Sequence, residues 1–127
     1  MVKQIIRTER APASALYSQG VKVGPTVYVA GMAGLDPATK QMAGSTIQDQ
    51  TRQALRNCEA VLAAAGGTLQ DVVSVTVLLA NPADWDGMNE VYGKAFAGEP
   101  PVRAVTRLGP ELPNVLVSIA MIAHVEG

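Results

Sequence analysis

The pattern of apolar and polar residues in the first third of the chain predicts short β-strands. β-Branched runs at residues 21–23 and 26–31 flank Gly24-Pro25, a combination that is typical of a hairpin. Residues 3–7 carry a shorter run and predict a first strand. The stretch from Gly34 to Gly44 contains an Asp-Pro pair and indicates a loop before the next element.

Two helices are predicted further along the chain. The first can be capped by Ser45 or Thr46 and ended by Gly66-Gly67. Between these limits its apolar and small residues share one helical face, which consists of Ile47, Ala54, Leu55, Cys58, Val61, Leu62 and Ala65. The second helix is predicted from a capping signal at residues 81–84 to about Phe96.

Three more strands are predicted at residues 72–79, 102–108 and 115–123. The element order is then β-β-β-α-β-α-β-β. Two helices are too few to cover both faces of a sheet of this size, so we expect an α+β fold with both helices on one face. The chain has no internal repeat and no linker, and residues 1–127 are therefore expected to form a single domain.

The two longest later strands do not alternate as a half-exposed strand would. Their two predicted faces both carry apolar or small residues: Val73, Val75, Val77 and Leu79 against Val72, Ser74, Thr76 and Leu78, and Val115, Val117, Ile119 and Met121 against Leu116, Ser118, Ala120 and Ile122. If the helices cover one face, something else must cover the other. A second copy of the same chain is the simplest cover, since most soluble oligomers are closed and homomeric.

Composition excludes several classes of function. Ten basic and eleven acidic residues are scattered along the chain, and the five aromatic residues do not cluster, which argues against a nucleic-acid interface. One histidine and one cysteine cannot build a zinc site alone, so we expect no metal. No window is apolar enough to span a membrane, and the start lacks the apolar run of a signal peptide. Cytoplasm is the expected location.

Arg103 is the best candidate for chemistry. It follows Pro100-Pro101 at the start of a strand, where a fixed guanidinium could hold a carboxylate or phosphate with two hydrogen bonds. A surface or salt-bridging arginine is the alternative. Tyr17 offers a hydroxyl to a ligand or packs in the core. Cys58 and His124 have no partner in sequence and are interpreted as structural.

The chain resembles the Rid/YjgF family of reactive-intermediate (enamine/imine) deaminases, which older annotation calls endoribonucleases L-PSP or translation initiation inhibitors. The resemblance covers nearly the full length. The segments that carry it, in family order, are residues 11–13, 17–20, 27–31, 50–57, 64–67, 72–77, 89–92 and 100–103.

This resemblance implies a chorismate-mutase-like α+β fold with a mostly antiparallel sheet. It also implies a homotrimer around a central barrel, with a cleft at each subunit interface and no cofactor. By the same resemblance, Arg103 grips the substrate carboxylate, Tyr17 lies in the cleft, and Gly31 supplies a backbone donor. Asn89 matches the asparagine of the second helix, and Val105 falls where a backbone group lines the pocket.

Two positions depart from the deaminase pattern. Ala30 stands where the best-known deaminases carry serine, and Ser118 stands where they carry the glutamate thought to position or activate water. A hydroxyl can hold a water but cannot act as a carboxylate base. The leading hypothesis is hydrolysis of short imino acids such as 2-iminopropionate, with Arg103, Tyr17 and Ser118 as catalytic residues. A module of the same family that binds a small carboxylate without catalysis is the alternative, and a ribonuclease or translation inhibitor is more remote.

Overall fold

The computed structural model describes residues 2–126. Two 3₁₀ turns, Leu69–Asp71 and Pro82–Asp84, supplement the main elements. In chain order these elements are β1 (Lys3–Ile6), β2 (Gly20–Val23), β3 (Thr26–Ala33), α1 (Ile47–Ala64), β4 (Val72–Leu79), α2 (Trp85–Ala95), β5 (Val102–Arg107) and β6 (Val117–His124).

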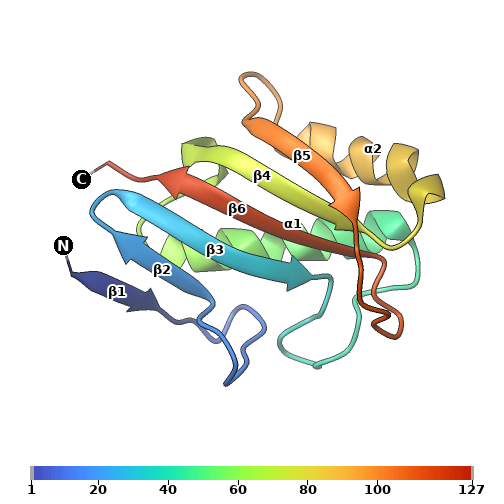
Figure 1. Cartoon of the computed structure of the whole chain (residues 1–127), viewed down its shortest axis with the longest axis horizontal. Helices are drawn as coiled ribbons and strands as arrows, with labels where there is room; N and C mark the ends of the chain where they lie inside the picture. Colours follow the sequence, from blue (N-terminus) through green and yellow to red (C-terminus); the bar gives the residue numbers. More distant parts are fainter. Residues whose placement is uncertain (1, 127) are drawn as a thin grey trace.

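The strands form one six-stranded mixed sheet in the order β1-β2-β3-β6-β4-β5. All neighbouring pairs are antiparallel except β4 and β5, which are parallel because α2 connects them. Both helices lie behind the sheet in Figure 1, and α1 packs on β3, β6 and α2. The predicted α+β class, with two helices on one face, is confirmed. Within residues 2–126, no helix is long and apolar enough to cross a membrane.

α1 follows the sequence prediction closely. The Thr46 side chain caps its start by accepting a hydrogen bond of 3.1 Å from the Asp49 backbone N–H. Gly66, just beyond its end, has φ 86°, a conformation that favours glycine. Cys58 is fully buried on the inner face, as predicted for a core thiol.

The other elements differ from prediction mainly at their ends. α2 begins at Trp85, because residues 82–84 form a 3₁₀ turn instead of the first helical turn. Asn81 precedes this turn and makes no side-chain capping bond. The first strand ends at Ile6 instead of residue 7, the fifth ends one residue early, and the last runs from 117 to 124 instead of 115 to 123.

β-Bulges shift which side chains face the helices. The pairing of β4 with β6 slips between Val72 and Ser74, so that Val72 and Val75 are buried while Val73 is 50% exposed. The prediction that Val73 shares a face with Val75 was therefore wrong. A second slip, between Val29 and Met32 on β3, lets both of these residues face the core.

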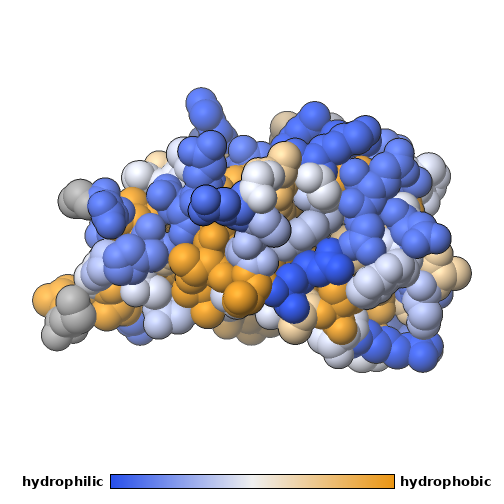
Figure 2. Space-filling model, turned by 90° about the horizontal axis from the view of Figure 1, so that it is seen from above, coloured by the Kyte–Doolittle hydropathy of each residue, from blue (hydrophilic) through white to orange (hydrophobic). Residues whose placement is uncertain are grey.

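The face of the sheet opposite the helices is not covered by any other element of residues 2–126. This open face is turned toward the viewer in Figure 1 and carries partly exposed, small or apolar side chains, among them Tyr28, Leu78, Ala120 and Ile122. Figure 2 looks down on the β5 edge and shows apolar side chains reaching the surface between polar ones. The predicted excess of apolar residues on both faces is thus present in the fold.

Candidate functional site

Arg103 lies on the side of the sheet that faces the helices. It pairs in register with Val75, which pairs in turn with Met121, and both of these neighbours are buried against the helices. Its Nη1 donates a hydrogen bond of 2.6 Å to Asn89 Oδ1 on α2. Arg103 and Asn89, each predicted as a site residue, are therefore in direct contact.

Two aromatic rings of α2 hold the same guanidinium. Arg103 Cζ lies 4.8 Å from the centroid of the Tyr92 ring and 5.3 Å from that of Trp85. Residues 85, 89 and 92 are spaced four and three apart, so their side chains emerge on one face of the helix. The sequence analysis did not identify Trp85 and Tyr92 as site residues. Their spacing of four and three residues from Asn89 could have indicated that they share its helical face.

The guanidinium has no acidic partner. Within residues 2–126, the one ion pair joins Arg52 and Asp49 on α1, so no carboxylate lies within 4 Å of Arg103. The Tyr92 hydroxyl beside it is buried without a hydrogen-bond partner, and burial raises its pKa while the positive charge of Arg103 opposes that rise. An arginine held by neutral groups keeps most of its five N–H donors free for an anion.

The backbone of β5 adds donors beside Arg103. Leu108 N–H donates to Leu79 O on β4, at 2.9 Å, just past the end of β5. Because successive residues of a strand point their N–H and C=O groups to opposite edges, those of Arg103, Val105 and Arg107 point away from β4. β5 is the last strand of the sheet, so these groups lie at its free edge. The backbone N–H and C=O of Val105 therefore lie at the free edge of the sheet, and their part in a substrate pocket stays a prediction.

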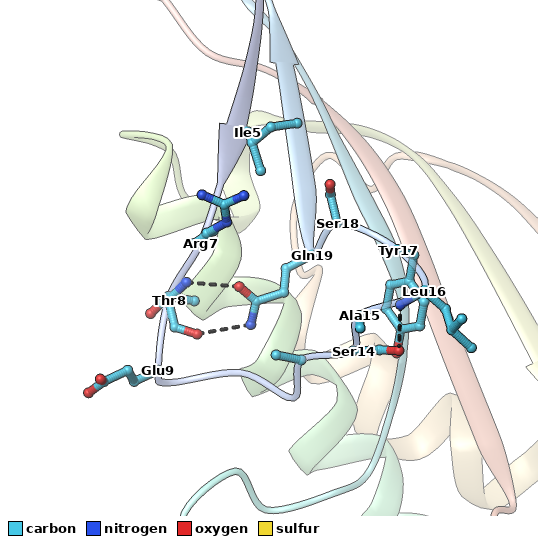
Figure 3. A pocket seen from close by; sticks show the side chains of 11 residues that line it. Ile5, Arg7, Thr8, Glu9, Ser14, Ala15, Leu16, Tyr17, Ser18 and Gln19 are labelled. Carbon is cyan, nitrogen blue, oxygen red and sulfur yellow. Dashed lines mark hydrogen bonds between the residues drawn. The ribbon is translucent and has the colours of Figure 1, made fainter.

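A second group of predicted residues lies on the central strands β3 and β6 and on the loop between β1 and β2. Ser118 sits between the buried Val117 and Ile119 and so points to the open face. Gly31 is next to it, since a Cβ at Gly31 would lie 2.9 Å from Ser118 Oγ. Tyr17 is 50% exposed in the loop between β1 and β2 (Figure 3), which argues against a packing role.

These two groups do not meet within one chain. Arg103 faces α2, whereas Ser118 lies on the opposite face of the sheet, two strands away across β4. The predicted site residues Arg103 and Ser118 therefore do not come together inside a single chain. Side chains alternate between the two faces of a strand, and packing of the core fixes which of them face the helices. Arg103 faces the helices, whereas Ser118 faces the open side of the sheet.

Open grooves lie next to both groups. A hollow of about 310 Å³ beside Trp85 and Val105 is also lined by Leu79, Pro82, Thr106 and Arg107. A larger one, of about 750 Å³, follows the loop that carries Tyr17 (Figure 3). Among residues 2–126, no three His, Cys, Asp or Glu side chains gather in a way that could hold a metal. Burial raises the pKa of Cys58 well above its ordinary range, which keeps its thiol protonated.

Comparisons with known proteins agree with this fold. The family model described as endoribonuclease L-PSP matches residues 8–125. A RutC family protein of Saccharolobus solfataricus is 43% identical over 124 residues, 97% of this chain and 98% of that protein. The 2-iminobutanoate/2-iminopropanoate deaminase of Mus musculus is 40% identical over 105 residues, 82% of this chain and 78% of that protein. The crystal structure of E. coli TdcF with bound serine has a TM-score of 0.90 at 32% identity, over 97% of this chain and 99% of that one.

Proposed function

Because the chain belongs to the endoribonuclease L-PSP family, also called Rid/YjgF, we propose that it hydrolyses short 2-imino acids to 2-keto acids and ammonia. The observation that carries this proposal is the Arg103 guanidinium. It is held by Asn89, Trp85 and Tyr92, and no acidic side chain in the described part of the chain pairs with it. Such a group is a ready anchor for the carboxylate of a small substrate. The similarity to named imine deaminases supports the reaction type.

The complete site would lie between subunits. Arg103, Asn89 and Val105 form one half, and Tyr17, Ala30, Gly31 and Ser118 form the other, on a different part of the chain's surface. In the proposed homotrimer, open sheet faces pack around a central barrel, and the half-site of one subunit meets the complementary half of the next. Covering the apolar open face supplies the driving force for this assembly.

Light scattering at micromolar concentration tests the assembly. The expected mass is about three times the 13.2 kDa of one chain. A stable monomer would contradict the barrel and the intersubunit cleft together, and the two half-sites would then have no way to meet.

The chemistry proposed for this cleft is the addition of water to a polarised C=N bond. Arg103 and the Val105 N–H hold the carboxylate, so that the imine carbon faces the groups of the second half-site. Water adds to that carbon, a proton moves to nitrogen, and the resulting carbinolamine expels ammonia to leave the ketone. Backbone N–H groups near Gly31 and the hydroxyls of Tyr17 and Ser118 would orient the water, and the protons would move through water itself.

No carboxylate base enters this scheme. Ser118 can hold a water through its hydroxyl but cannot take a proton from it at neutral pH. Imines hydrolyse readily without strong base catalysis, so orienting substrate and water supplies the main part of the proposed acceleration. The proposal is therefore one of a deaminase that relies on positioning.

The test is the decay of 2-iminopropionate generated in situ, followed with and without the protein. A rate that rises in proportion to enzyme concentration, with keto acid and ammonia formed in equal amounts, supports the proposal. No acceleration at micromolar protein would refute it. The Arg103→Ala variant serves as the matched control, because it removes the anchor and leaves the second half-site intact.

Binding without catalysis is the second candidate function. Ser118 and Ala30 favour it, since Ser118 lacks the carboxylate and Ala30 the hydroxyl that the deaminase pattern carries at these positions. TdcF is also a relative with serine bound. Calorimetry with 2-ketobutyrate separates the two readings. Tight binding by a protein that turns over no imine would favour the binding module.

A further inference from the structure

The Gln19 side chain holds together the long loop between β1 and β2. Its amide is only 5% exposed. Oε1 accepts a hydrogen bond of 2.8 Å from Thr8 N–H, and Nε2 donates to the carbonyls of Thr8, Ala11 and Pro12 at 2.9, 2.9 and 3.1 Å. Figure 3 shows the two bonds with Thr8. One side chain thus satisfies four backbone groups spread over five residues.

The backbone of Gln19 is tied to the other part of the same half-site. Its carbonyl accepts a hydrogen bond of 2.9 Å from Ala30 N–H, at the start of the bulge that contains Gly31. The next residue, Gly20, packs so tightly that a Cβ there would lie 2.6 Å from Val61 Cγ1 on α1. Gln19 is therefore fixed to the body of the protein and cannot move with the loop.

Apart from Ala11, which is buried in the core, the loop has little else to hold its tip. Its other side-chain hydrogen bonds are local ones, from Arg10 N–H to Thr8 Oγ1 and from Leu16 N–H to Ser14 Oγ. Leu16 is 92% exposed and Tyr17 half exposed, so neither anchors the loop by burial. Ordering exposed residues costs conformational entropy, which the buried amide bonds of Gln19 must offset.

We propose that Gln19 is a positioning residue: it fixes the Tyr17 loop relative to the Ala30–Gly31 bulge, and so sets the geometry of the second half-site. Gln19 does not touch substrate in this scheme and acts through Tyr17. The inference rests on the proposed function only where it assigns Tyr17 to the substrate site. The connection between loop and bulge is a property of the fold itself.

The structural part is tested by hydrogen exchange on the full-length protein. Gln19→Met has a similar shape but removes the acceptor and both donors. Amide exchange in residues 8–18 should then speed up about tenfold or more, as expected for the loss of at least one net hydrogen bond. Unchanged exchange in this segment would overturn the proposal.

The matched control is Gln50→Met. Gln50 is also a buried amide, 1% exposed, that ties distant loops: Nε2 donates to the carbonyls of Gly44 and Asn114, and Oε1 accepts from Leu116 N–H. Its loss should speed exchange near residues 44 and 114–116 and leave residues 8–18 unaffected. Faster exchange of the Tyr17 loop in both variants would mean general destabilisation and would contradict a specific role for Gln19.

The functional part is tested by combining Gln19→Met with Tyr17→Phe. If Gln19 acts through Tyr17, its substitution should lower kcat/KM for 2-iminopropionate about tenfold in the parent and less than about twofold in Tyr17→Phe. Equal effects in both backgrounds would refute positioning through Tyr17. If Gln19→Met does not fold, Gln19→Glu, which keeps the acceptor but not the donors, takes its place.

The same experiment separates this inference from the proposed function. If the parent protein hydrolyses no imine, the deaminase proposal is refuted. The effects of Gln19→Met in the parent and in Tyr17→Phe are then compared through the affinity for 2-ketobutyrate. The exchange experiment is independent of any activity. Slow exchange in the parent and fast exchange in Gln19→Met would support the positioning role even if the reaction proved to be a different one.

Discussion

The two proposed half-sites of this protein are built in different ways. On the β5–α2 side, Arg103 is held by an amide and two rings, all contributed by one face of one helix. On the other side, the candidate groups are hydroxyls and backbone amides on a loop, a bulge and a strand, linked through Gln19. The first is a rigid binding group that is complete within the chain. The second offers weak polar groups whose value depends on where they are placed.

This difference indicates how the two sides divide the work. A preorganised guanidinium supplies binding energy to any small carboxylate and has little power to select a reaction. The candidate residues of the second side, Tyr17, Ala30, Gly31 and Ser118, carry no charge. They are therefore suited to orienting water and substrate through hydrogen bonds. Changes on the first side should therefore affect binding most, and changes on the second should affect turnover.

Removal of the Arg103 guanidinium should have the largest effect. Arg103→Ala is expected to weaken 2-ketobutyrate binding about 10- to 150-fold, since hydrogen bonds to charged groups contribute about 1.5–3 kcal/mol. Arg103→Lys should recover part of the loss, because an ammonium cannot reproduce the planar fork. Calorimetry measures both, with circular dichroism and light scattering as controls of fold and assembly. If Arg103→Ala bound 2-ketobutyrate as tightly as the parent protein, the carboxylate site would not be at Arg103.

Ser118→Glu tests the second side by adding a group instead of removing one: it supplies the carboxylate that the deaminase pattern carries at this position. We expect kcat for 2-iminopropionate to rise about 10²-fold, the lower range for a positioned acid–base group, with little change in ketoacid affinity. Steady-state kinetics and calorimetry on the same samples check the two statements. A parent that is already fast, with a variant no faster, would mean that positioning suffices and that the cleft suits another substrate.

Gly31→Ala should measure how tightly the bulge is packed against Ser118. The added methyl would lie 2.9 Å from Ser118 Oγ, so we expect overpacking to lower the free energy of unfolding by about 1–3 kcal/mol. Removing that oxygen with Ser118→Ala should relieve most of the cost in the double variant. Urea denaturation of the four proteins tests this. Additive losses would show that the methyl meets something other than Ser118.

The smallest effect is expected from replacing Trp85, the more distant of the two rings that contact the Arg103 guanidinium. Trp85→Leu removes a partly exposed cation–π contact worth about 0.5–1 kcal/mol, so ketoacid affinity should fall only about two- to fivefold. The value of kcat should stay within twofold, because the second side is untouched. Calorimetry and initial rates provide the two numbers. A large fall in kcat with unchanged affinity would contradict the division of work between the two sides.

The residues that the sequence named for the site lie in two separate groups within one chain, and this division was not predicted. Asn89 and Arg103 were expected to share a site, and they are 2.6 Å apart in their closest polar atoms. Gly31 and Ser118 were both named, and they are neighbours. Trp85 and Tyr92 were missed because an aromatic residue on an amphipathic helix is most simply read as core. Gln19 was part of a recognised segment, but nothing in the sequence showed that its amide would be buried among backbone carbonyls.

The sequence by itself determined the class of fold and the order of its elements, because apolar periodicity and capping chemistry act over a few residues. α1 began and ended close to the predicted residues for this reason. Tertiary structure alone decided the strand order, the parallel pairing of β4 with β5 and the bulges at Val73 and Ala30–Gly31. A bulge reverses the inward and outward alternation of every residue beyond it, and it arises where pairing across the whole sheet outweighs local pattern. For the same reason, only the assembled sheet shows that Arg103 and Ser118 lie on opposite faces.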